Sequence, residues 1–250
     1  MKVACSSATF ARPIADGALT QLEWVDLCAN ELEVDGIVFD LAQFPRTDAD
    51  YLAQLKKLAA DLGLSVAAVS AADAFGASGD AAIDVAALLG APLVIGTAPS
   101  AGEDPAAWGN FADAVKDRSR AAKRANVTLA ARNAAGTLCA SSADLKRLAK
   151  DVDSAWLRYA LDPAALGTSD DATALLGKSV IAAHSIRDLA GFGRAGDSEA
   201  ERLIAALARF RGFVLLETAS APEPRDAYHH AARRFATLRA SALQESASTR

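Results

Sequence analysis

The chain has few cysteines and no long apolar run, and each scarcity excludes a class of protein. Its three cysteines, Cys5, Cys28 and Cys139, are far apart and form no CxxC pair, so neither a disulfide framework nor a zinc knuckle is expected. No stretch approaches the ~20 apolar residues that a membrane-spanning helix needs. Residues 1–6 lack the apolar core of a signal peptide. We therefore expect a cytoplasmic protein with no membrane partner.

Motifs and charges for binding nucleotides or nucleic acids are also lacking. There is no GxxxxGK[ST] motif, and no GxGxxG motif follows the first apolar segment. The net charge of −5 argues against a nucleic-acid partner, because phosphate contacts need clustered lysines and arginines. The basic run over residues 116–124 contains an interspersed acid in a long helical pattern. We expect it to be a solvated outer face rather than a phosphate or partner site.

The chain does contain a regular alternation of short apolar segments with longer segments of helical periodicity. The expected strands cover residues 3–6, 37–40, 64–70, 93–96, 127–132, 156–162, 180–185 and 213–217. The expected helices cover residues 19–32, 49–62, 80–89, 105–125, 143–150, 171–176, 199–210 and 226–243. Strands separated by helices indicate βαβ units and a parallel sheet.

Eight such units are expected to close into a (β/α)8 TIM barrel, and 250 residues are near the usual size of that fold. No long linker divides the chain. We therefore expect an α/β fold with a single domain over residues 1–243 and a frayed tail over residues 244–250. The alternative is an open doubly wound sheet, which usually has fewer strands and a topological switch point.

Local signals mark several of the expected helix ends. Thr20 and Glu23 have the spacing of a capping box. Asp104 precedes Pro105, which places an N-cap acid before a proline at the first helical position. Gly90 stands where a helix should end and a strand begin.

Polar residues at the ends of apolar strands form the candidate site, because the active site of a β/α barrel collects at the C-terminal ends of its strands. Arg132, Asp162 and Glu217 end the fifth, sixth and eighth expected strands. The two carboxylates suit a divalent cation, whereas arginine has no acceptor and cannot ligate metal. The candidates for contact with a substrate are Phe10, Asp40, Asn133, His184 and Arg187.

Six segments together carry a resemblance to a known family. They are SSATF at residues 6–10, VDGIVFD at 34–40, NVTLAARN at 126–133, AWLRYALD at 155–162, IRD at 186–188 and GFVLLE at 212–217. Their order and spacing resemble the xylose isomerase-like barrels, which comprise sugar isomerases and epimerases, hydroxypyruvate isomerases, inosose dehydratases and endonuclease IV-type enzymes. The resemblance covers nearly the whole chain.

The resemblance implies a divalent cation, Mn, Mg or Zn, held by a glutamate, an aspartate, a histidine and a glutamate on strands five to eight. Asp162 and Glu217 match the second and fourth of these ligands, but Arg132 stands in the place of the first. The family spacing puts the histidine position at Ser185, and His184 is one residue away, which turns a side chain to the other face of a strand. Either residue can face the cavity. We expect no cofactor unless the metal site proves intact.

The charges suggest what Arg132 does in that place. Together with Asp162 and Glu217 it carries the same net charge as three family carboxylates with a dication. We hypothesise that the Arg132 guanidinium replaces the cation and bridges the two acids. Three other interpretations stay open: a purely structural ion pair, a site for an anionic substrate, and a misaligned strand that leaves a metal site intact.

Two functions fit these residues. The first is an isomerase or epimerase of a small sugar or hydroxy-keto acid, with Glu217 or Asp162 as the base and Arg132 as the electrophile. The alternative is a non-catalytic barrel that binds a small sugar or carboxylate, or serves as a structural or assembly subunit. A homo-oligomer is expected because related barrels often associate. DNA repair by several zinc ions is rejected, because His229 and His230 lie on a basic helical face.

Overall fold

The computed structural model describes residues 2–162, 165–166, 179–185, 207, 210–217 and 223–248. Arg187, the expected helix over residues 171–176 and most of the expected helix over residues 199–210 lie outside the described residues. For residues 179–185 the backbone is described, and the side chains are not.

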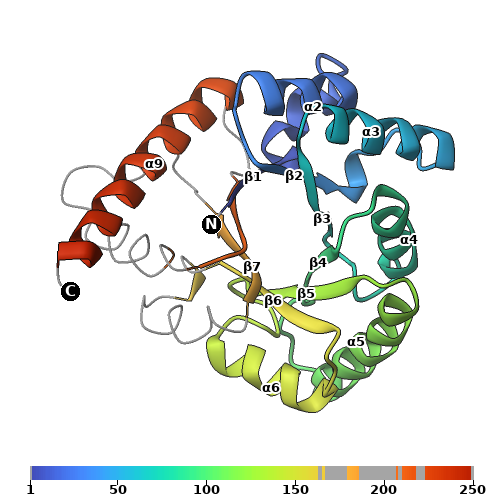
Figure 1. Ribbon diagram of the computed structural model, residues 1–250. Coiled ribbons are helices and arrows are strands. Elements are labelled where there is room, and N and C mark those ends of the chain that lie inside the picture. Colours follow the sequence, from blue (N-terminus) through green and yellow to red (C-terminus); the bar gives the residue numbers. More distant parts are fainter. Residues whose placement is uncertain are drawn as a thin grey trace.

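The strands form a closed barrel in chain order, with β1 paired in parallel to both β2 and β8 (Figure 1). Each strand bound lies within one residue of the expected one. The prediction of an α/β TIM-barrel fold is therefore confirmed, and the open doubly wound sheet is excluded. The strands are β1 (Lys2–Ser6), β2 (Gly36–Asp40), β3 (Ser65–Ala71), β4 (Leu93–Thr97), β5 (Thr128–Arg132), β6 (Leu157–Leu161), β7 (Ser179–Ser185) and β8 (Phe213–Glu217).

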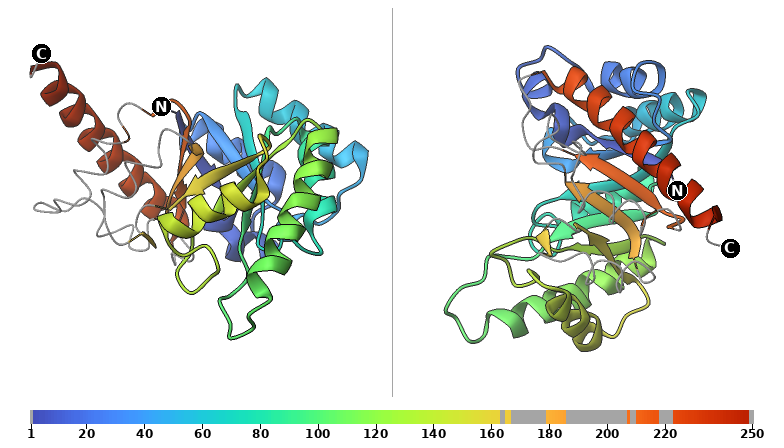
Figure 2. Two further views of the ribbon diagram at one scale, coloured as in Figure 1. Left: turned by 90° about the horizontal axis from the view of Figure 1, so that it is seen from below. Right: turned by 90° about the vertical axis from the view of Figure 1, so that its left-hand side faces the viewer.

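The described helices lie on the outside of the strands (Figure 1). Among the described residues, none of them is both long and apolar enough to cross a membrane. The longest, α9, projects away from the strands at its C-terminal end (Figure 2). It continues to Ser248, so residues 244–248 are helical where a frayed tail was expected. The helices are α2 (Gln21–Asn30), α3 (Ala49–Asp61), α4 (Gly79–Leu89), α5 (Ala107–Arg124), α6 (Ser142–Val152) and α9 (Pro224–Ser248).

The helix ends follow the predicted signals with one correction. Thr20 and Glu23 form a full capping box, in which the Thr20 N–H donates to Glu23 Oε2 at 2.8 Å, and Gly90 caps α4 with a φ of 74°. The expectation that α5 begins at Pro105 was wrong, because the helix begins at Ala107. Asp104 still caps the approach to it, since its Oδ1 accepts the Ala106 N–H at 2.9 Å.

Three short elements after the first two strands were not predicted. A 3-10 helix, η1 (Ser7–Phe10), and a one-turn helix, α1 (Ala11–Ala15), follow β1, and a second 3-10 helix, η2 (Leu41–Gln43), follows β2. Segments this short show no helical periodicity in the sequence. They matter because they shape the rim of the barrel on the side of the candidate site.

Small side chains fill the inside of the barrel, and large ones pack between the strands and the helices. The interior cluster is mainly alanine with a few branched residues, and the outer cluster includes Trp24, Phe39 and Phe235, each at most 1% exposed. Burying side chains of this size stabilises the fold by roughly 2–3 kcal/mol each. Gly36 belongs to the interior, where a Cβ atom would lie 2.6 Å from the Phe213 ring.

Candidate functional site

A ring of polar side chains lies above the apolar interior, at the C-terminal ends of the strands. Because side chains alternate along a strand, a residue two positions after an inward-facing one also faces inward. Ala130, Ala160 and Leu215 belong to the interior cluster. Each polar member of the ring lies two residues after a member of that cluster: Ser6, Asp40, Ser70, Thr97, Arg132, Asp162 and Glu217.

The guanidinium of Arg132 contacts two acids: Asp162, which follows the neighbouring strand β6, and Glu217 at the end of β8, which is not adjacent to β5. Its Nη1 lies 2.6 Å from Oε2 of Glu217, and its Nη2 lies 3.6 Å from Oδ2 of Asp162. The side chains are 20%, 11% and 7% exposed for Arg132, Glu217 and Asp162 respectively. The predicted contact of Arg132 with both carboxylates is therefore confirmed. Desolvation makes an unpaired charge expensive here, so the three groups stabilise one another.

The electrostatics of Arg132 reflect this balance. Burial by itself lowers the pKa of the guanidinium, whereas the charges of Glu217 and Asp162 and the hydrogen bonds to them raise it. The net effect is a pKa above the ordinary value for arginine. Arg132 is thus a fixed cation at the mouth of the barrel, with more N–H donors than its two carboxylate contacts use.

Asn133 holds the end of β6 in place. Its Nδ2 donates to the carbonyl oxygen of Asp162 at 2.8 Å, and its Oδ1 accepts the Asp162 N–H at 2.7 Å. The Asn133 side chain is fully buried. This geometry gives Asn133 the role of positioning Asp162, and it does not support the expected contact with a substrate.

Asp40, at the end of β2, has a different environment. Its Oδ1 accepts the Ala42 N–H at 2.9 Å, and its Oδ2 accepts the Ser70 hydroxyl at 3.2 Å. Burial raises the pKa of Asp40; the two hydrogen bonds lower it by less, and the charge of Glu217 adds to the rise. The Asp40 N–H donates to Ser7 Oγ at 2.9 Å. Ser7 was not singled out from the sequence, although a hydroxyl directly after the first strand was a usable signal.

No contact among the described residues places the remaining predicted residues at the barrel mouth. Phe10 is 2% exposed and packs in the outer core, so its contact with a substrate stays a prediction. In the backbone register, Ser185 pairs with Glu217, and His184 pairs with Leu216. The side chains of both β7 residues lie outside the described part of the structure.

The described residues at the mouth do not fit a divalent cation. Metal ions of this kind prefer several carboxylate or carbonyl oxygens, and the guanidinium of Arg132 already lies against Asp162 and Glu217. A second cation between these acids would be repelled by it. Within the described part of the chain, no group of three or more His, Cys, Asp or Glu side chains is arranged to hold a metal.

Comparisons with known proteins agree with the TIM-barrel architecture. A family described as "xylose isomerase-like TIM barrel" matches residues 27–238. No curated protein matches the sequence. Among solved structures, an L-ribulose 3-epimerase aligns with a TM-score of 0.78 and 18% identity, covering 99% of this chain and 97% of its own.

Two further structures show the same likeness in fold. A D-allulose 3-epimerase from Methylomonas sp., in complex with D-allulose, has a TM-score of 0.73 and 14% identity over 96% of this chain and 97% of its own. A probable 3-DHS dehydratase from Bacillus anthracis has a TM-score of 0.72 and 13% identity over 93% and 98%. At these identities the comparison concerns the fold alone.

Proposed function

Because the chain belongs to the xylose isomerase-like TIM barrel family, we propose that it is an isomerase or epimerase of a small sugar or hydroxy-keto compound, in which Arg132 takes the place of the family's metal ion. The observation that carries the proposal is the guanidinium placed 2.6 Å from Glu217 and 3.6 Å from Asp162. The guanidinium supplies positive charge at the barrel mouth. Sugar epimerases are among the solved structures that have this fold.

The proposed chemistry is proton transfer next to a carbonyl group. A carboxylate removes the proton from the carbon beside the carbonyl, the C–H electron pair forms a C=C bond, and the carbonyl oxygen becomes an enediolate oxygen. The N–H groups of Arg132 stabilise that oxygen, as fixed donors do where negative charge develops. Return of a proton to the opposite face of the same carbon gives the epimer. Return to the neighbouring carbon, with transfer of the hydroxyl proton of the enediolate to the adjacent oxygen, gives the isomer.

The carboxylates divide these tasks by their environment. We assign Glu217 as the base, with Asp162 held beside it by Asn133 as the alternative base. Asp40 suits the acid, because burial raises its pKa and favours the protonated form. The proposed residues for substrate contact are Phe10, His184 and Arg187.

Solvent deuterium exchange tests the proposal directly. The protein, stripped of metal with EDTA, is incubated in D2O with each of a panel of ketoses, aldoses and hydroxypyruvate, and the C–H signals are followed by NMR. We expect loss of the signal beside the carbonyl for at least one compound, unchanged by EDTA. Glu217→Gln should slow the exchange by about 10²-fold or more, whereas Glu103→Gln, which changes an exposed glutamate, should not.

Two results would contradict the proposal. Absence of exchange for the whole panel, with and without Mn²⁺ or Mg²⁺, would remove the isomerase function. Exchange that requires added metal would show that Arg132 does not replace the ion.

A second candidate function is binding without turnover. It is favoured by the contact between Arg132 and Glu217, because the guanidinium already occupies the carboxylate oxygen that would have to accept the proton. This function predicts no deuterium exchange but a rise in melting temperature with a sugar or carboxylate ligand. If no such ligand shifts the melting temperature, the binding function fails as well.

A further inference from the structure

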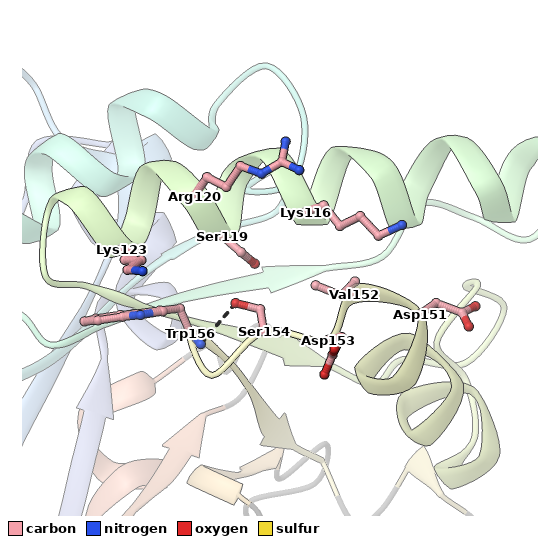
Figure 3. Close-up of a pocket in the computed structure, with 9 residues that line it drawn as sticks. All are labelled: Lys116, Ser119, Arg120, Lys123, Asp151, Val152, Asp153, Ser154 and Trp156. Carbon is pink, nitrogen blue, oxygen red and sulfur yellow. Dashed lines mark hydrogen bonds between the residues drawn. The ribbon is translucent and has the colours of Figure 1, made fainter.

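A groove of about 510 Å³ lies on the flank of the barrel, between α5 and the segment that joins α6 to β6 (Figure 3). This segment, residues 153–156, precedes β6, and the last turns of α5 precede β5, so this end of the groove lies near the N-terminal ends of these strands. Arg132 and Asp162 lie at the C-terminal ends of the same strands. The groove is therefore separate from the candidate site at the barrel mouth.

One wall of the groove carries a stripe of cations. Lys116, Arg120 and Lys123 line it from α5, and their spacing of four and three residues places them on one helical face. Lys116 contacts Asp113 at 3.2 Å and Arg120 contacts Asp117 at 2.7 Å. Lys123 has no ion pair among the described residues.

The acids of the opposite wall do not neutralise Lys123. Asp151 is engaged elsewhere, because its Oδ2 accepts the Trp108 Nε1–H at 2.8 Å and lies 3.6 Å from Nε of Arg147. Asp153 is exposed and points away from α5 (Figure 3). A positive charge is thus left on the α5 side of the groove.

A buried hydroxyl provides an independent sign of a ligand. Ser119 lies on α5 between the cations, is 3% exposed, and points toward the opposite wall (Figure 3). Its Oγ has no hydrogen-bond partner among the described residues. A serine inside a helix can donate to the carbonyl four residues earlier, and Ser119 does not. Leaving a buried hydroxyl without a hydrogen bond is unfavourable, so we expect the Ser119 hydroxyl to form one with a ligand in the groove.

The far end of the groove presents an aromatic surface. The half-buried side chain of Trp156 lines it, and its backbone N–H donates to Ser154 Oγ at 3.2 Å, which fixes the turn before β6. Lys123 and Trp156 lie at the same end of the groove (Figure 3). An indole ring offers a flat apolar face beside these polar groups, a combination typical of small-molecule sites.

We propose that this groove binds a small phosphorylated molecule, with the phosphate held by the Lys123 ammonium and the Ser119 hydroxyl and the rest of the ligand against Trp156. A phosphate has several acceptor oxygens and can take both donors at once, and its contact with a lysine is a charge-assisted hydrogen bond. The volume is within the range of sites for metabolite-sized ligands. This inference is independent of the function proposed for the barrel mouth.

The test uses the full chain with glucose 6-phosphate, glucose and inorganic phosphate as probes at constant ionic strength. We expect glucose 6-phosphate to raise the melting temperature and change the tryptophan fluorescence, inorganic phosphate to act more weakly, and glucose to act least. Lys123→Ala should weaken glucose 6-phosphate binding about tenfold, and the matched control Arg124→Ala, which changes the next residue of the same helix outside the groove, should not. Trp156→Phe should remove the fluorescence change.

Ser119→Ala separates a binding role from a structural one. Removing an unpaired buried hydroxyl should leave the free protein as stable as before or more stable, while the response to glucose 6-phosphate falls about tenfold. Arg132→Lys should leave the response unchanged. The proposal is overturned if Lys123→Ala and Ser119→Ala bind as the parent does, if Arg132→Lys alone removes binding, or if sodium chloride gives the same response at equal ionic strength.

Discussion

Two parts of the barrel mouth hold buried or partly buried carboxylates in different ways. On the β5–β8 side, Asp162 and Glu217 share the guanidinium of Arg132. On the β2–β3 side, Asp40 has hydrogen bonds from the Ser70 hydroxyl and the Ala42 N–H, and no ion pair among the described residues. The first arrangement keeps a fixed cation among acids, and the second raises the pKa of the acid by burial. The comparison shows how one layer of a barrel can offer both charged groups and a group suited to carrying a proton.

Arg132→Glu replaces the positive charge at this position with a negative one and should have the largest effect on stability. Three carboxylates would then face one another, and without metal the free energy of unfolding should fall by about 4 kcal/mol or more. Mn²⁺ should bind this variant, because three carboxylates form a divalent site, and restore most of the lost stability. Calorimetric titration with MnCl2 and melting curves with and without EDTA measure both effects. Absence of metal uptake would show that the guanidinium does not occupy a cation position.

Arg132→Gln removes the charge without adding an acid. We expect a loss of about 2–3 kcal/mol in the free energy of unfolding at pH 7, measured by urea titration, because two partly buried carboxylates lose their partner. Arg132→Lys keeps the charge and should lose less. A loss as large in Arg132→Lys as in Arg132→Gln would point to packing instead of charge.

The sequence was sufficient for the charged side of the mouth and for most of the fold. The alternation of side chains along a strand and the positions of the strand ends place Arg132, Asp162 and Glu217 in one layer. The ion pairs follow because the arginine side chain is long and its charge is opposite to that of the two acids. The role of Asn133 was not predictable, because its side chain binds backbone groups of β6, which carry no residue-specific signal. Phe10 was predicted to contact a substrate. The sequence could not show which side chains of η1 are buried, because this helix is too short to have a visible periodicity.

Asn133→Ala tests whether the charged side depends on its anchoring. The change would leave the buried N–H and C=O of Asp162 without their side-chain partners, so we expect a loss of about 2 kcal/mol in the free energy of unfolding. It should also slow the proposed exchange reaction by displacing Asp162. Asn30→Ala removes an exposed asparagine bound to Asp26 and should change stability by less than about 0.5 kcal/mol. Equal losses in the two variants would argue against a special role for Asn133.

Asp40→Asn tests the uncharged side and should have the smallest effect. Because the pKa of Asp40 is raised in the folded protein, ionisation of this carboxyl destabilises the fold. The penalty is absent below the unfolded pKa of about 3.9 and is fully present once the pH has risen above the folded value. Asp40→Asn cannot ionise, so its stability relative to the parent should rise between pH 4 and pH 7. Solvent screening limits that rise to about 0.5 kcal/mol. Urea titrations across this range measure the difference, and a relative stability that falls with pH would mean that Asp40 is stabilised in its charged form, as an acid beside an undetected cation would be.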